Sequence, residues 1–202
     1  MRRTPGRLGG YTLIEVMTAV VVMTIGATGI LAMQGASVRS NQDANETSVA
    51  INFATTWIER IKRDAARQWT TTGVTAMNNT TYLRLSDTYY IPLPADARES
   101  YGADYFGFDT RTEGCIYFCV NMRGSIAHAY NPLDPGAVPD LANDVNALRT
   151  DVRVWWYRWG PDADRNVGPR CNATAGVLST AQLDDPRIRK HYLSTVVTWR
   201  AP

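Results

Sequence analysis

The chain contains one long apolar stretch, residues 16–33, in which no side chain is charged. About 18 residues at ~1.5 Å of helical rise can cross the roughly 30 Å apolar core of a bilayer. Because these residues are apolar on every side, the pattern predicts a helix in lipid or in the core of a helical filament. Glu15 stands at the edge of the stretch, where an unpaired carboxylate costs a few kcal/mol.

Beyond a polar segment at residues 34–46, apolar positions recur at spacings of three and four, which places them on one face of a helix. This apolar stripe comprises Ala50, Phe53, Ala54, Trp57, Ile58, Ile61 and Ala65. No proline occurs between residues 11 and 67. The pattern predicts one continuous helix over residues 11–67, ~85 Å long at the usual rise, whose second half lies against a sheet.

The remaining apolar runs are short and several alternate with polar residues, as strands do. Strands are predicted at residues 81–85, 115–122, 151–157 and 191–200. Between them lie long segments rich in Pro, Gly and Asp, at residues 92–114, 131–146 and 160–186. Loops this long are uncommon in compact domains unless they are functional. We expect an α+β protein with an antiparallel sheet of about four strands, covered on one face by the helix.

The first ten residues hold three arginines and no acid. Positive charge before an apolar span keeps that end cytoplasmic, so the rest of the chain is expected outside the membrane. A small residue, Gly10, precedes the apolar stretch, whereas a secretory signal is cut after its apolar region. A cut at Gly10 would therefore keep the helix. Glycine suits such a site because it lets the backbone approach catalytic groups closely.

The sequence Gly10-Tyr11-Thr12-Leu13-Ile14-Glu15, followed by the apolar stretch, resembles the class III signal of type IV pilins and pseudopilins. The resemblance implies that a prepilin peptidase cuts after Gly10 and methylates the new N-terminal residue, Tyr11. It also implies that Glu15 neutralises the N-terminal amine of a neighbouring subunit. The alternative for Glu15 is a carboxylate at headgroup level that reaches water.

The same resemblance implies the type IV pilin fold, a long N-terminal helix packed on a C-terminal antiparallel sheet. Residues 1–10 are then a leader peptide, residues 11–67 the long helix and residues 68–202 the β-sheet head domain. Residues 11–33 form the part of the helix that lies in the membrane or the filament core.

Three further segments, residues 29–34, 39–42 and 58–61, resemble minor pilins of the PilV type. This implies a minor pilin that primes assembly of, or sits at the tip of, a type IV pilus, together with other minor pilins and the major pilin. The expected location is the inner membrane, with one span and a periplasmic head, and then the pilus at the cell surface. The alternatives are a minor pseudopilin of a type II secretion system, and a pilus-tip adhesin or DNA-uptake subunit.

Three cysteines, Cys115, Cys119 and Cys171, lie in the part expected outside the cell's reducing interior, where disulfides persist. In a straight strand Cys115 and Cys119 would be ~13 Å apart, too far to bond. A disulfide from Cys171 to one of the other two is therefore preferred. A bulge or turn would still allow the Cys115–Cys119 bond. Three scattered thiols lack the fourth ligand of a usual structural zinc site.

A weak calcium candidate is formed by Asp162, Asp164 and Asn166, because acids at alternate positions resemble the start of a calcium loop. The terminal glutamate of an EF-hand is missing, and the alternative is a polar turn. Neither histidine lies near a nucleophile motif, so no enzyme activity and no cofactor are expected.

The aromatic cluster Trp155, Trp156, Tyr157 and Trp159 is interpreted as core packing or a subunit interface. Removal of the leader's three arginines would leave 18 basic residues against 19 acidic ones. Without a global positive field, nucleic acid is not expected as the main partner.

Overall fold

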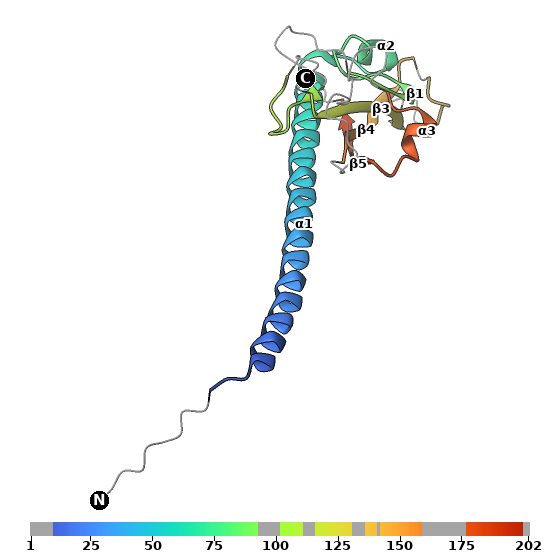
Figure 1. Cartoon of the computed structure of the whole chain (residues 1–202). Coiled ribbons are helices and arrows are strands. Elements are labelled where there is room, and N and C mark those ends of the chain that lie inside the picture. The colour runs from blue at the N-terminus through green and yellow to red at the C-terminus, as the bar shows by residue number, and fades with distance from the viewer. Residues whose placement is uncertain are drawn as a thin grey trace, which may run out of the picture. The chain divides into compact units, whose positions relative to one another are not determined.

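The computed structural model describes residues 10–92, 102–110, 116–130, 136–140, 142–158 and 177–199. The chain separates into two compact units, Met1–Ala44 and Asn45–Pro202. Helix α1 (Leu13–Gln68) begins in the first unit and ends in the second (Figure 1). The helix predicted over residues 11–67 is therefore confirmed, and it begins at Leu13.

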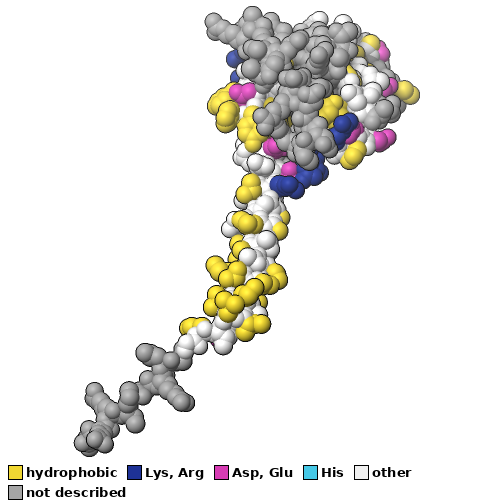
Figure 2. Space-filling model, viewed as in Figure 1, with side chains coloured by type: hydrophobic (Ala, Val, Ile, Leu, Met, Phe, Trp, Pro, Cys, Tyr) yellow, Lys and Arg dark blue, Asp and Glu magenta, His cyan; other side chains and the backbone are white. Residues whose placement is uncertain are grey.

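The first unit consists of the apolar part of α1. In the part of the chain that the structure describes, α1 is the one helix long and apolar enough to cross a membrane. None of its most apolar window of 18 residues is buried within the protein. Figure 2 shows hydrophobic side chains exposed along this stretch. These features are consistent with single-pass membrane anchoring.

The second unit contains an antiparallel sheet with, among the described residues, five strands in the order β1-β3-β4-β5 and β2 paired to β3. The strands are β1 (Ser86–Tyr90), β2 (Gly102–Ala103), β3 (Phe118–Ala129), β4 (Val145–Tyr157) and β5 (Ile188–Thr198). Two short helices, α2 (Val74–Met77) and α3 (Thr180–Leu183), lie in the connections. The three predicted strands nearest the C-terminus correspond to β3, β4 and β5.

The strand predicted at residues 81–85 is wrong, because β1 begins only at Ser86. Side chains take the place of a strand partner in this segment. The Tyr82 N–H donates to Asp64 at 3.0 Å, and the Leu83 N–H donates to the Thr80 hydroxyl at 3.1 Å. With backbone groups satisfied in this way, the segment needs no ladder.

The main core lies between α1 and one face of the sheet. Every residue of the predicted apolar stripe is buried, which confirms the prediction. Trp57 is fully buried and packs edge-on against Phe53 and Tyr82, with ring centroids 6.4 and 5.4 Å apart. The sheet supplies Phe118, Val120, Met122, Leu148, Val152, Val154 and Trp156 to this core.

A second, smaller core lies on the other face of the sheet, as the alternation of side chains along a strand requires. It contains Ile116, Cys119, Trp155, Leu178 and Ile188. Trp155 and Trp156 thus pack into different cores, which confirms the packing interpretation for these two residues, whereas Trp159 lies outside the described residues. The long helix and antiparallel sheet form an α+β arrangement that matches a type IV pilin fold.

Candidate functional site

The residues of the N-terminal motif lie at the start of α1. Gly10 and Tyr11 precede the helix, and Glu15 lies in its first turn. The Glu15 N–H donates to the Thr12 carbonyl at 3.1 Å, so the first turn is closed by backbone hydrogen bonds. A carboxylate in a first turn is stabilised by the helix dipole, by roughly 0.3–1 kcal/mol. Tyr11 is 83 % exposed, so both the backbone before it and its side chain are accessible.

The polar side chains inside the apolar stretch are satisfied within the helix itself. The hydroxyls of Thr18, Thr24 and Thr28 donate to backbone carbonyls one turn back, at 3.0, 2.8 and 2.9 Å. A hydroxyl bonded in this way needs no water, so these threonines are compatible with a lipid environment.

Two glycines interrupt the same apolar stretch, and α1 runs through both as helix. A Cβ added at Gly26 or Gly29 would meet nothing within 4 Å. This bare surface allows another helix to approach closely, as small residues do in membrane helix pairs.

In the second unit, α1 is joined to the sheet by a buried carboxylate, Glu46, which is 5 % exposed. One of its oxygens accepts a hydrogen bond from the Tyr117 hydroxyl at 2.9 Å. The other accepts from the Trp156 indole N–H at 3.0 Å. The sequence offered a signal for this contact, because Glu46 precedes Ala50 by four residues and is therefore in phase with the apolar stripe. The sequence pattern nevertheless places Glu46 in the polar segment at residues 34–46, because a single acid before the stripe is typical of a solvent-exposed part of a helix.

A second buried acid on α1, Asp64, fixes the segment that follows the helix. It accepts the Tyr82 N–H, as described above, and burial raises the pKa of its carboxyl although hydrogen bonds from Thr81 oppose the shift. Glu46 thus attaches two side chains of the head to α1, and Asp64 attaches irregular backbone to it.

The face of the sheet turned away from α1 carries a charged network centred on Asp151 in β4. This carboxylate accepts from Arg123 at 2.7 Å, from Arg149 at 3.0 Å and from the Ser194 hydroxyl. Burial raises the pKa of Asp151, but the hydrogen bonds from Ser194, Arg123 and Arg149 outweigh it and hold the pKa below its usual value. The network joins β3, β4 and β5.

Beside this network lies Arg153, which is 2 % exposed. Its guanidinium stacks over the Tyr89 ring, 4.0 Å from the centroid, and donates to the Asn121 side-chain oxygen at 2.9 Å. Burial lowers the pKa of Arg153, and the nearby tyrosines Tyr192 and Tyr89 oppose the shift. Arginine is suited to such a site because its flat guanidinium can stack on an aromatic ring while it donates at its edge.

The turn that follows β2 exposes two phenylalanines on a well-held backbone. Phe106 and Phe108 are 73 % and 72 % exposed. The Asp104 carboxylate accepts the backbone N–H of both, each at 2.9 Å. Gly107 has a positive φ of 87°, and a Cβ there would come within 2.9 Å of the Val49 side chain of α1. Exposed aromatic residues on a rigid turn are typical of a contact surface.

Cys119, in β3, is disulfide-bonded. The other two cysteines, Cys115 and Cys171, lie outside the described residues, so the choice between them stays a prediction. Cys119 packs beside Leu178 and Ile188, in the smaller core.

We expect mass mapping of the non-reduced protein to find Cys119 joined to Cys171, with Cys115 as the free thiol. The reason is the ~13 Å that would separate Cys115 from Cys119 if the extended chain of β3 continued back to Cys115. A peptide containing a Cys115–Cys119 bond would contradict this pairing, as would three free thiols. Alkylation before reduction provides the control, since it labels only the free thiol.

The calcium candidates Asp162, Asp164 and Asn166 also lie outside the described residues. Among the residues that are described, no group of three or more His, Cys, Asp or Glu side chains is arranged to hold a metal ion. The His128 ring is held by the Asn146 side-chain oxygen at 2.8 Å.

The chain was compared with protein-family models, with curated proteins and with solved structures, and none of them matches it.

Proposed function

We propose that the chain is a PilV-type minor pilin, which primes assembly of, or sits at the tip of, a type IV pilus together with other minor pilins and the major pilin. The observation that carries the proposal is the combination at the N-terminus. A basic leader and Gly10 are followed by a helix with Glu15 in its first turn and an apolar, fully exposed stretch behind it. An apolar helix exposed on every side needs lipid or other helices around it.

The accessible segment around Gly10 and Tyr11 suits processing by a prepilin peptidase. Cleavage would leave Tyr11 as the N-terminal residue, with a methylated and positively charged amine. Glu15 of one subunit would then pair with this amine on a neighbour in the apolar filament core. Before assembly the protein would be anchored in the inner membrane by one span, with its head in the periplasm. Its role is structural, and the proposal involves no catalysis.

Two features of the head support a structural subunit that acts through contacts with other proteins. The rigid turn presents Phe106 and Phe108 to solvent, and the core fixes the helix to the sheet through Glu46. Exposed aromatic side chains of this kind are the usual anchors of a protein interface.

The experiment that tests the function is co-purification. The full-length protein, tagged at its C-terminus and expressed in its own host, is extracted from membranes and its partners are identified. Recovery of other pilins in amounts comparable with the bait would support the proposal. Recovery of secretion-system pseudopilins in their place would favour the type II secretion alternative, and a bait free of any pilin-like partner would contradict both.

A Gly10→Val variant is expected to accumulate as the uncleaved precursor. A β-branched side chain obstructs the extended, close approach that a peptidase needs at this residue. Insertion should continue, because the apolar stretch and the charge asymmetry are unchanged. The measurement is the size of the membrane-bound protein on a gel, with Gly9→Val as the matched control. A mature-sized band in Gly10→Val would show that the cleavage site lies elsewhere.

A further inference from the structure

Among the described residues, the strand β5 forms an edge of the sheet, and its C-terminal half lacks the charges and prolines that usually protect an edge strand from pairing. Among the described residues, β5 pairs with β4 on one side and with no strand on the other. Its pairing with β4 runs from Ile188 to Thr198 without a bulge. Residues 193–198 contain neither a charge nor a proline. Natural edge strands normally carry such features, because a regular, uncharged edge invites another strand to add.

The backbone groups of Val196 point to this open edge. The Trp199 N–H donates to the Asn146 carbonyl at 2.8 Å, toward β4. Backbone groups of alternate residues in a strand face opposite sides, so Val197 also faces β4 and Val196 faces outward. The Val196 side chain is 53 % exposed. An incoming strand would therefore find both a donor and an acceptor at this position.

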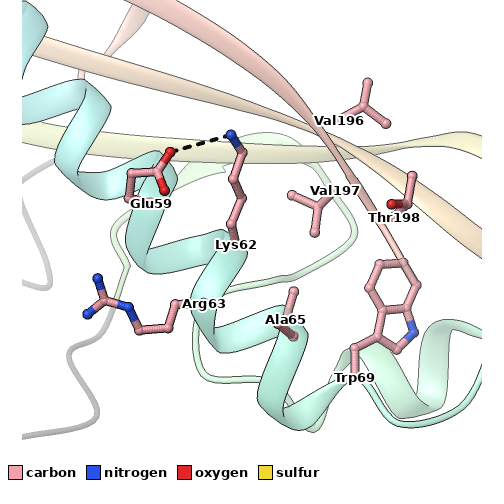
Figure 3. A pocket seen from close by; sticks show the side chains of 9 residues that line it. Glu59, Lys62, Arg63, Ala65, Trp69, Val196, Val197 and Thr198 are labelled. Carbon is pink, nitrogen blue, oxygen red and sulfur yellow. Dashed lines mark hydrogen bonds and ion pairs between the residues drawn. The ribbon is translucent and has the colours of Figure 1, made fainter. Parts of the chain in front are cut away.

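A pocket of about 450 Å³ lies beside the same end of β5, between the strand and α1 (Figure 3). Ala65, Trp69 and Val197 give it an apolar floor, and Glu59, Lys62 and Arg63 of α1 stand at its rim. An added strand would point alternate side chains toward α1, since successive side chains point to opposite faces of a sheet. One such side chain would enter the pocket.

The charges at the rim of the pocket indicate which kind of group would lie next to the apolar side chain of an added strand. Lys62 is 3.5 Å from Glu59, a weak exposed pair, whereas Arg63 makes no ion pair among the described residues. The rim thus carries one positive charge in excess. An acidic side chain or a C-terminal carboxylate next to the apolar residue would complement it.

We propose that the β5 edge binds an extended segment of a partner protein as an added strand. The bound segment places a large apolar side chain in the pocket and an acidic group beside Lys62 and Arg63. This mode of binding draws affinity from backbone hydrogen bonds and specificity from the pocket. The inference rests on the proposed function only for the source of the strand, which would be another subunit of the pilus.

The test uses the full-length protein in detergent and a fluorescently labelled peptide of about ten residues, which is a usual strand length. The peptide alternates leucine and threonine and ends in aspartate, so that it offers large apolar side chains and an acidic end. Fluorescence anisotropy should show saturable binding. Val196→Pro should weaken it by roughly tenfold or more, because proline removes the outward donor but leaves the bonds to β4. Val196→Thr is the matched variant, since it keeps the outward donor with a side chain of similar size, and it should bind the peptide much more tightly than Val196→Pro does.

Two further arms do not depend on the fold tolerating proline. A peptide N-methylated at alternate positions should not bind, because its edge-facing donors are blocked. Arg63→Glu should bind the peptide less tightly, and a version ending in lysine more tightly. Absence of saturable binding would overturn the proposal, as would equal binding of the N-methylated peptide. Failure of pilin co-purification with peptide binding intact would count against the proposed function alone.

Discussion

A Glu15→Leu variant is expected to be made, inserted and cleaved normally, yet not to be recruited to the pilin partners proposed above. Within a filament, the amine of one subunit and the carboxylate of another would both sit among apolar helices. There an unpaired charge costs on the order of 3–5 kcal/mol, whereas a pair costs much less. Leucine leaves the neighbour's amine unpaired, and a loss of ~3 kcal/mol lowers an association constant roughly a hundredfold. In lipid alone the variant helix is more stable, because leucine is apolar.

The measurement is pull-down or crosslinking of partners from membranes, run alongside a cleavage assay. Glu15→Asp is the matched variant, because it keeps the carboxylate on a shorter side chain, and its recruitment should lie between the other two. Thr18→Leu serves as a control, since it changes polarity one turn away without removing a charge. Normal recruitment of Glu15→Leu would refute the pairing role and favour a carboxylate that only reaches water.

Glu46→Leu is expected to lower the free energy of unfolding of the head by roughly 2–4 kcal/mol. The substitution removes two charge-assisted hydrogen bonds and leaves the Trp156 indole N–H buried without its acceptor. The Tyr117 hydroxyl is less affected, because the Tyr157 carbonyl lies 3.3 Å away. For a protein of this size, the loss corresponds to a fall of roughly 5–15 °C in the melting temperature.

The full-length protein in detergent would be unfolded by heat and by urea to measure this effect. Near-UV circular dichroism would report the unfolding. Glu46→Gln is the informative control. Its amide keeps one acceptor oxygen, whereas the amide nitrogen can only donate a hydrogen bond. It should cost about half as much, with one donor still satisfied. Equal stability of Glu46→Leu and the unmodified protein would show that the helix is held by apolar packing alone.

The long helix could be predicted closely from the sequence because its signals are local and repeated. A proline-free run and an apolar stripe fixed its extent, and the structure moved its start only to Leu13 and its end to Gln68. The strands were harder. Residues 81–85 have the composition of a strand, but Asp64 and Thr80 satisfy part of their backbone. Asp64 lies 18 residues before Tyr82, and such a distant partner leaves no trace in a short window.

The site residues also divide into those that the sequence could predict and those that it could not. Gly10, Tyr11 and Glu15 were visible as a motif, since their meaning depends on spacing alone. Glu46 and Arg153 were not, because a buried charge becomes recognisable only when the groups that satisfy it are known. Two-residue β2 and the turn that presents Phe106 are held by contacts to β3 and α1, which the surrounding polar sequence does not reveal.

The packing of α1 on the sheet has a mechanical consequence for any force that is applied along the helix. A pull applied at Asn45 along the helix axis would act on the buried contacts between Glu46 and Ala65 at once. They would have to slide together past β3 and β4, in shear, rather than open one by one as in peeling. Shear shares a force among many bonds and so slows forced unfolding, which is set by a rate rather than by equilibrium stability. Glu46 would share that load with the apolar contacts through its two hydrogen bonds, which tie α1 to Tyr117 and Trp156.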